Sequence, residues 1–281
     1  MKEKTILCAG GDLRFSYMCR SLSRRGRIYA LGHDSISEVT ALSSPEDMPC
    51  AADVLVLPMM SGGLNVSISG KEVSFARLTR CLEQGALVLG GRLSPQQKAY
   101  FESGGFACED YFSRESLVVK NCLPTAEGAL QIALNETADT VFDSKVLVLG
   151  FGRTAKCCAR LFNSAGAHCT VCARRPEARA DAFTQGFDSF HPVRLAARAG
   201  AFDIIINTVP ALMLTDNVLT SVQKSALIID LASAPGGTDF SSANRLGIKA
   251  VHALALPAKT APAAAGRLIA ETIEEILDER G

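Results

Sequence analysis

The sequence "VLVLGFGRTAKCCARLF", from Val146 to Phe162, combines three local patterns. An apolar run typical of a buried strand leads into a glycine turn, and apolar residues at helical spacing follow. The turn fits the dinucleotide-binding pattern G-x-G-x-x-G/A, with a second strand expected at about residue 168. We predict that Gly150 permits the tight turn and that Gly152 lets a pyrophosphate approach the backbone. Ala155, in place of a third glycine, is small enough for close packing of helix on strand.

The end of the second expected strand, "VCARRPE", indicates which dinucleotide is bound. An NAD site usually carries Asp or Glu here, which accepts hydrogen bonds from the adenosine ribose. This sequence has Ala173, Arg174 and Arg175, so no carboxylate repels a 2′-phosphate and two cations can hold it. The sequence therefore predicts NADP rather than NAD. Arg153 and Thr154, at the start of the helix, are expected to make further phosphate contacts.

Two turns at the ends of later strands complete the expected cofactor edge. The turn "NTVP" follows an apolar strand and should lie along the dinucleotide near the nicotinamide ribose. Its expected cofactor contacts are Asn207, Thr208, Val209 and Pro210. The next strand ends in "DLAS", so Ser233 should face the same edge and contact the substrate.

The first third of the chain alternates buried strands with helices. Apolar runs in "TILCAGG", "ADVLVLPMMSGG" and "ALVLGG" are typical of parallel strands that are covered on both faces. The segment "SFARLTRCLEQG" is expected to be a helix with Gly85 as its C-cap. Glycine loops at residues 10–14, 58–63 and 90–93 follow the strands and should meet at the carboxyl edge, where ligands bind. They could also be no more than tight turns, which glycine serves equally well.

The segment "NCLPTAEGALQIALNETADTVF" has apolar residues at helical spacing. Thr125 follows a proline, and we expect it to be the N-cap of this helix. Because the helix leads directly into the strand "KVLVLG", it should bridge two domains, with its N-terminus near the cleft between them. Helix N-termini favour anions, so the amides of Thr125 and Ala126 are candidates for binding a carboxylate.

These patterns predict an α/β protein with two Rossmann-like, doubly wound parallel-sheet domains and an interdomain cleft. Residues 1–123 would form an N-terminal domain for substrate and partner. The C-terminal amphipathic helix, 262–281, would join that domain. Residues 124–142 would form the bridging helix, and residues 143–261 the NADP-binding Rossmann domain.

The composition excludes several functional classes. The chain has 281 residues, 48% of them hydrophobic, with zero formal net charge and no block of like charge. We therefore expect no nucleic-acid or membrane surface. No apolar run approaches the roughly 18 residues of a membrane span, and the start of the chain resembles a first strand rather than a signal peptide. A cytoplasmic protein is expected.

The ten cysteines predict neither disulfides nor a metal site. Cys169 and Cys172 form a CxxC, but the segment "HCTVCA" is typical of a strand, in which positions i and i+3 point to opposite faces. Cys157 and Cys158 lie in the expected helix and also point apart. With only four scattered histidines, no ligand cluster forms, so we expect reduced cysteines and no metal.

Six motifs together resemble one enzyme family, the A subunits of dipicolinate synthase from spore-forming bacteria. They are "GGDLR", "NCLPTAEGA", "VLGFGRTA", "NTVPA", "DLASAPGGTDF" and "LALPAKTAPAAAGRLIAETI". The resemblance covers essentially the whole chain, and "DLASAPGGTDF" and "PTAEG" are more specific than the glycine pattern. The departures are Ala155 and "LALPAK" where "LGLPGK" is expected, both small-for-small changes.

The resemblance implies an NADP-dependent oxidation that aromatises a dihydro- or hydroxytetrahydrodipicolinate, a precursor shared with lysine biosynthesis, to dipicolinate. It also implies that the partner is a flavoprotein-like B subunit, and that the protein works in the mother cell of a sporulating bacterium. Association with further copies of the chain is compatible with the sequence.

Such a reaction needs a hydride acceptor, a base for the accompanying proton, and cations or helix termini for two carboxylates. The cations Arg14, Arg92 and Lys259 are candidates for substrate binding, together with Gly11 in the first glycine loop. Glu127, expected in the first turn of the bridging helix, is the leading candidate for the base, and Asp12 is the second. Acidic residues also favour helix first turns for structural reasons alone, which is the alternative explanation of Glu127.

Two other functional classes fit parts of the sequence. One is another two-domain NADP-dependent dehydrogenase of the shikimate or 2-hydroxyacid type. The first type lacks its expected Lys–Asp pair, and for the second His252 has no partners at suitable spacing. The other class is a non-catalytic regulator that senses NADP. The glycine loops of the first domain argue against it, because a sensor needs no second ligand edge.

Overall fold

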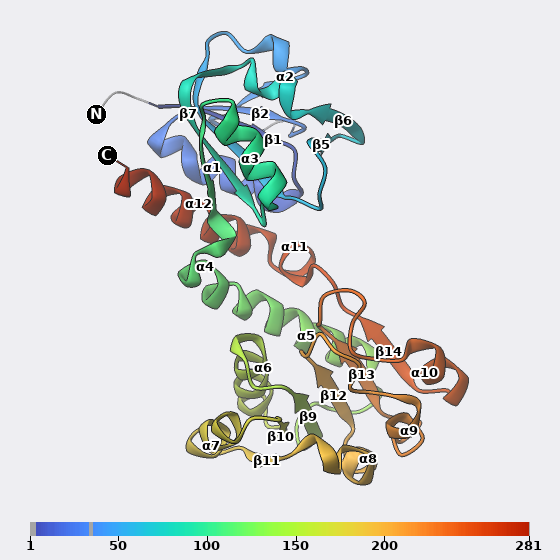
Figure 1. Cartoon of the computed structure of the whole chain (residues 1–281). Helices are drawn as coiled ribbons and strands as arrows, with labels where there is room; N and C mark the ends of the chain where they lie inside the picture. Colours follow the sequence, from blue (N-terminus) through green and yellow to red (C-terminus); the bar gives the residue numbers. More distant parts are fainter. Residues whose placement is uncertain (1–3, 34–35, 281) are drawn as a thin grey trace. The chain divides into compact units, whose positions relative to one another are not determined.

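The computed structural model describes residues 4–33 and 36–280. The chain forms two compact units (Figure 1). The first contains residues 4–121 together with 261–280, and the second contains residues 122–260.

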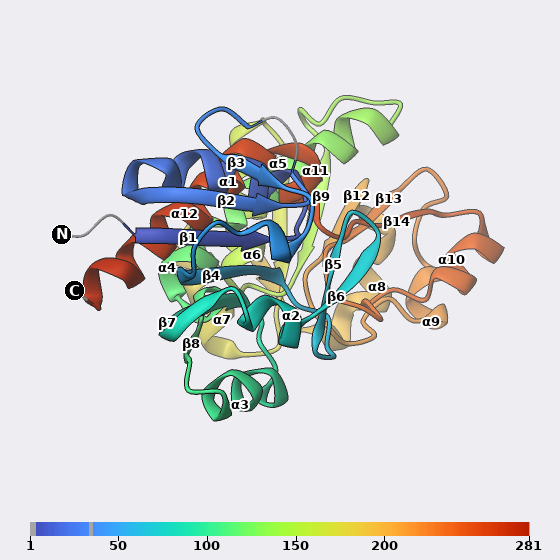
Figure 2. The same ribbon diagram turned by 90° about the horizontal axis from the view of Figure 1, so that it is seen from above.

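The first unit is built on a six-stranded parallel sheet in the order β3-β2-β1-β4-β7-β8. Figure 2 shows β2, β1, β4 and β7 running side by side. The strands are β1 (Lys4–Ala9), β2 (Gly26–Leu31), β3 (Thr40–Leu42), β4 (Ala52–Met59), β7 (Leu82–Gly91) and β8 (Ala107–Asp110), and an antiparallel hairpin adds β5 (Asn65–Ile68) and β6 (Lys71–Ser74). The helices are α1 (Leu13–Leu22), α2 (Phe75–Thr79), α3 (Pro95–Ser103), α4 (Glu115–Lys120) and α12 (Pro262–Glu279).

This sheet is covered on both faces, which explains its continuous apolar strands. On one face, Ile6, Val54 and other strand residues pack against α1, α4 and α12. On the other face, Leu7 and Leu55 pack against α2, α3 and the β5–β6 hairpin. Neighbouring residues of a strand therefore serve opposite cores, as the period of two requires.

The second unit repeats the plan with the order β11-β10-β9-β12-β13-β14, again all parallel. Its strands are β9 (Lys145–Leu149), β10 (His168–Cys172), β11 (Asp188–Phe190), β12 (Ile204–Asn207), β13 (Leu227–Asp230) and β14 (Lys249–His252). Its helices are α5 (Cys122–Glu136), α6 (Arg153–Ser164), α7 (Pro176–Thr184), α8 (Leu195–Arg198), α9 (Asp216–Leu219), α10 (Phe240–Leu246) and α11 (Leu256–Thr260). The strand order is that of a doubly wound dinucleotide-binding fold. The predicted fold class, two Rossmann-like parallel-sheet units, is thereby confirmed.

The two faces of the second sheet carry separate cores. One packs against α5, α6, α7 and α11, and the other against α8, α9 and α10. Cys169 belongs to the first core and Cys172 to the second, so the two thiols of the CxxC point to opposite faces, as the sequence predicts. Burial raises the pKa of each of these thiols to about 12. In the described part of the chain all ten cysteines are free thiols.

The helix expected to end at Gly85 is shorter than predicted. It ends at Thr79, and Gly85 lies within β7 with φ of +75°. β7 starts at Leu82 because this residue pairs with Ala52, and the register of the two strands shifts before Val54. Gly85 therefore serves an irregularity in the strand rather than a C-cap.

The start of α5 also differs from the prediction. The helix begins at Cys122, so Thr125 is not its N-cap, and its first turn holds no acidic residue. Pro124 does not block this start because proline fits the first turn, where its missing N–H would find no partner. Glu127 consequently lies beyond the first turn, and the amides of Thr125 and Ala126 are within the helix rather than at its end.

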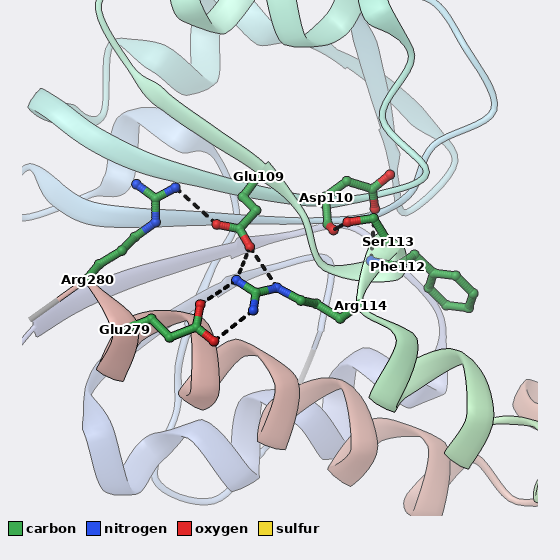
Figure 3. A network of polar contacts seen from close by, with 7 residues as sticks. All are labelled: Glu109, Asp110, Phe112, Ser113, Arg114, Glu279 and Arg280. Carbon is green, nitrogen blue, oxygen red and sulfur yellow. Dashed lines mark hydrogen bonds and ion pairs between the residues drawn. The ribbon is translucent and has the colours of Figure 1, made fainter.

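Helix α12 is tied to the edge of the first sheet by a network of charged side chains (Figure 3). Arg114 donates to Glu109 and, over 2.6 and 2.7 Å, to both carboxylate oxygens of Glu279, while Arg280 donates to Glu109 over 3.0 Å. The hydrogen bonds from Arg114 lower the pKa of Glu279. Because Glu279 and Arg280 are exposed, these pairs add little to stability one by one, and the apolar face of α12 is the main anchor.

Candidate functional site

The carboxyl ends of β9 and β12 form the switch point of the second sheet, where doubly wound folds bind ligands. Gly150 has φ of +90°, and its N–H donates to the carbonyl of Cys172 over 2.8 Å. A Cβ on Gly150 would lie 2.8 Å from Oγ1 of Thr208, whose hydroxyl donates to the carbonyl of Leu149. The protein itself therefore requires glycine at this position.

Gly152 differs, because nothing within the protein requires glycine there. Its φ is −84°, and a Cβ would meet no atom within 4 Å. The residue immediately precedes α6, a helix of 12 residues that has no side-chain cap at its N-terminus. Open space beside uncapped helix amides is what a close-lying phosphate needs, so this turn fits a dinucleotide pyrophosphate.

The third position of the pattern has the packing role that the sequence predicts. Ala155 is fully buried in the core between α6 and the sheet. Thr154, half-buried, has its Oγ1 3.4 Å from the thiol of Cys122 at the start of α5. The N-termini of α5 and α6 thus adjoin, and both contribute positive potential beside the turn. Arg153 is exposed at the same place.

The loop after β10 carries the predicted cations. Ala173 is buried, whereas Arg174 and Arg175 are exposed, and neither has an ion-pair partner in the part of the chain that the structure describes. Arg179, one turn into α7, donates to the carbonyls of Ala173 and Arg174 over 2.8 Å each and thereby fixes the loop. The sequence did not single out Arg179; its spacing of four residues from Arg175 was the available signal.

The side chain of Asn207 has a different role from the predicted cofactor contact. It is fully buried, donating to Oδ1 of Asp230 over 2.9 Å and to the carbonyl of Val209, and accepting from the N–H of Val209. Its amide is thus engaged in holding the turn. Pro210 is exposed, and so is Ser233, whose carbonyl accepts from the N–H of Gly236.

The first unit has a pocket of about 560 Å³ at the carboxyl ends of its strands, which we call the N-terminal-unit pocket. Two of the three glycine loops line it, through Gly11 in one and residues 58–63 in the other. The hairpin β5–β6 contributes further walls, including Glu72. Arg92 and its loop are not among the described lining residues; the guanidinium of Arg92 lies 5.4 Å from the ring centroid of Phe112.

The charges of this pocket are Asp12, Arg14 and Glu72. Arg14 Nε and Nη2 donate to the carboxylate of Asp12 over 2.6 to 3.1 Å, and Nη1 lies 3.9 Å from Sδ of Met59. Partial burial acts to raise the pKa of Asp12, but hydrogen bonds and charge from Arg14 outweigh it, so the pKa is lowered. This corrects the expectation of a carboxyl group with a raised pKa: Asp12 orients Arg14 and is a weak base.

The remaining predicted residues lie in the second unit. Glu127 is exposed on α5, and Lys259 is exposed on α11. Ala126 is fully buried within α5, so its amide is unsuited to the predicted contact with a carboxylate. Thr125 is half-buried on the same helix.

The described residues contain no group of three or more His, Cys, Asp or Glu side chains that could hold a metal ion. Over the same residues, no helix is long and apolar enough to cross a membrane.

Comparisons with known proteins agree over the whole chain. A family profile described as the N-terminal domain of the dipicolinate synthase A chain matches residues 5–112. The curated A chain of dipicolinate synthase from Bacillus subtilis (strain 168) is 32% identical over 287 residues, which cover 98% of this chain and 96% of the relative. A crystal structure of the corresponding protein from Bacillus halodurans, 30% identical, matches with a TM-score of 0.87 over 98% of this chain and 97% of that one. A transhydrogenase from Sinorhizobium meliloti, 15% identical, shares the fold with a TM-score of 0.74 over 98% and 94% of the two chains.

Proposed function

The chain belongs to the family of dipicolinate synthase A subunits, and on this premise we propose that it is an NADP-dependent oxidoreductase. Its substrate would be a dihydro- or hydroxytetrahydrodipicolinate, which it oxidises to the aromatic ring of dipicolinate. A B subunit of flavoprotein-like type is proposed as its partner, and sporulation in the mother cell as its setting.

The observation that carries the proposal is the contrast between the two glycines of the turn. Gly150 is required by the fold, but Gly152 borders open space at an uncapped helix N-terminus. Only an approaching ligand gives a reason for glycine at position 152. The bound NADP would supply the acceptor for the hydride that the substrate loses.

The choice of NADP over NAD is supported by Arg174 and Arg175. They are exposed and unpaired among the described residues, beside a loop whose carbonyls Arg179 holds in place. Guanidinium groups form strong charge-assisted hydrogen bonds with phosphate, so this loop can bind a 2′-phosphate. Glu177, the nearest carboxylate along the chain after β10, is exposed in the first turn of α7.

On the substrate side we propose the N-terminal-unit pocket, with Gly11 and Arg14 as contacts. Arg14 is held by Asp12, which fixes the direction of its guanidinium before the substrate arrives. Glu127 stays the candidate base for the proton. Ser233, Arg92 and Lys259 stay candidates for the substrate carboxylates.

The cofactor assignment is tested by replacing Arg174 and Arg175 together with Ala. Each charge-assisted hydrogen bond contributes about 1.5–3 kcal/mol, so affinity for NADPH should fall roughly 10- to 100-fold. Affinity for NADH, which has no 2′-phosphate, should stay within about twofold because only the phosphate contacts are lost. Isothermal titration of the purified chain with each nucleotide measures both.

Arg160→Ala is the matched control, since Arg160 is exposed on α6 and its Nε contacts only the carbonyl of Lys156. It should change neither affinity. Equal loss of NADPH and NADH affinity in the double variant would contradict the role of the two arginines.

The reaction itself is tested by following NADPH formation with the lysine-pathway precursor and NADP, with the B subunit present or omitted. Dipicolinate formed together with NADPH supports the proposal. Turnover of shikimate or of a 2-hydroxy acid instead would identify another dehydrogenase. Nucleotide binding without turnover of any substrate, even with the partner, would identify an NADP sensor.

A further inference from the structure

Three polar residues end three neighbouring strands of the second sheet and lie side by side. Asn207 of β12 is the direct cross-strand partner of Asp230 of β13, and Asp230 is the direct partner of His252 of β14. Asn207 and Asp230 are fully buried, and His252 is half-buried. We call these three residues the polar row.

Asp230 is the centre of the polar row, and both of its carboxylate oxygens are fully used. Oδ1 accepts from Nδ2 of Asn207 over 2.9 Å and from the N–H of Ala232 over 3.0 Å. Oδ2 accepts from the N–H of Gly237 over 2.8 Å and from the hydroxyl of Thr238 over 2.7 Å. Within the described residues it has no ion-pair partner. A buried carboxylate is tolerated here because four donors replace its water.

These hydrogen bonds clamp the loop of residues 231–238 at both ends. Ala232 lies at its start, and Gly237 and Thr238 lie at its finish. The ring of His252 adds a third hold, with Nε2 3.1 Å from the carbonyl of Ala232. Since a carbonyl only accepts, this contact requires a proton on Nε2 of His252.

The same network joins this loop to the turn after β12. Asn207 bonds to Asp230 with one side and to Val209 with the other, so both turns are held by one cluster. The fit is close at Gly237, where a Cβ would lie 2.3 Å from Nδ2 of Asn207 and 2.6 Å from the carbonyl oxygen of Val209. At the tip of the loop, residues 233–235 are exposed.

The location determines which part of a dinucleotide this loop can affect. In this fold each half of the sheet takes one nucleotide, on either side of the switch point between β9 and β12. The 2′-phosphate loop after β10 lies on one side. The loop of residues 231–238, after β13, lies on the other and therefore borders the nicotinamide half.

We propose that Asp230 is a positioning residue: by clamping the loop of residues 231–238 it holds the surface on which the nicotinamide half of the cofactor is oriented. This inference rests on the proposed function. Asp230 does not serve as the base, because both oxygens are engaged and the side chain is buried away from any ligand.

The test is Asp230→Asn, which keeps the shape and replaces one acceptor oxygen by an amide donor. That amide would face existing donors on whichever side it lies, so the loop should loosen. Two probes separate the halves of the dinucleotide: NADPH and adenosine 2′,5′-bisphosphate, which lacks the nicotinamide half. We expect at least tenfold weaker binding of NADPH, with the bisphosphate within twofold of the unaltered chain.

Thr238→Val is the milder second variant, removing one of the four donors at nearly constant volume. It should lower NADPH affinity by a smaller factor, again without changing bisphosphate binding. Thr220→Val is its control, because the Thr220 hydroxyl is exposed and donates only to the carbonyl of Asn217. If Asp230→Asn does not fold, Thr238→Val decides.

The outcomes are distinct. Selective loss of NADPH affinity supports the inference. Equal loss of both probes, or loss of neither, overturns it while leaving the proposed function intact. If the unaltered chain binds neither probe, it is the proposed function that fails. His252→Gln, which keeps a donor near the Nε2 position, should retain NADPH binding better than His252→Ala.

Discussion

Single glycines show how residues with the same letter serve different ends. Gly150 is strained for any other residue, with φ of +90° and Thr208 close by. Gly152 has an ordinary backbone conformation and free space around it. One is therefore a requirement of the fold and the other of the ligand, although the sequence pattern contains both without distinction.

Exchanging each glycine for alanine should separate these roles. Gly150→Ala should destabilise the chain by about 1–3 kcal/mol, because it forces a side chain into a left-handed conformation and a clash. Gly152→Ala should leave stability unchanged or raise it by about 0.4–1 kcal/mol, since its φ suits alanine. NADPH affinity should nevertheless fall in Gly152→Ala because the Cβ fills the space for the pyrophosphate.

Thermal unfolding without nucleotide and titration with NADPH provide the two measurements. Undiminished affinity of Gly152→Ala for NADPH would show that no phosphate lies against this residue.

Carboxylates, too, are defined by their surroundings. Asp12 and Asp230 both follow or end a strand at a ligand edge, yet Asp12 is paired with Arg14 and Asp230 with four uncharged donors. The lowered pKa of Asp12 means that its pairing stabilises the fold above the ordinary Asp pKa and is lost as pH falls through the lowered value.

At the scale of elements, helix α12 completes the first unit from the far end of the sequence. Its buried face, including Ile269, Ile273 and Ile276, lies in the same core as β1 and α1. At Gly266 the helix approaches α1 so closely that a Cβ would lie 2.3 Å from the carbonyl oxygen of Arg14. Apolar burial of this kind contributes far more than the exposed ion pairs at Arg114 (Figure 3).

Ile273→Ala should therefore lower the free energy of unfolding by about 2–5 kcal/mol, because a fully buried side chain leaves a cavity. Glu275→Ala, at an exposed position on the same helix, should change it by no more than about 0.5 kcal/mol. Denaturant unfolding followed by circular dichroism compares the two. A cost at Ile273 no larger than that at Glu275 would mean that α12 does not anchor the unit.

Over the whole molecule, the two units differ in how the chain builds them. The second is one continuous stretch, residues 122–260, with two cores of its own. The first needs residues 4–121 and residues 261–280 together. Continuity in sequence lowers the entropy cost of closure, so the units should differ as isolated fragments.

A fragment of residues 122–260 should unfold cooperatively on heating and bind NADPH by itself. A fragment of residues 1–121 should not, because one face of its sheet lacks α12. Adding a peptide of residues 261–281 should restore part of its structure. Circular dichroism melts measure each case, and cooperative melting of 1–121 alone would contradict this account.

Features that depend on neighbours along the chain could be predicted from the amino-acid sequence. The strand–turn–helix of β9 and α6, the opposite faces of Cys169 and Cys172, and the packing role of Ala155 all follow from periodicity and local sterics. So does the α/β class, because buried strands alternate with helices in both halves of the chain.

Features that depend on distant partners could be known only from the packed structure. Pro124 within α5, the burial of Asn207, the pairing of Asp230 with residues on both neighbouring strands and the pKa of Asp12 have no local signature. Burial and hydrogen bonding are properties of the packed environment rather than of a residue's neighbours in sequence. Residues such as Asn207 and Asp230, 23 positions apart, acquire them only when the strands pair.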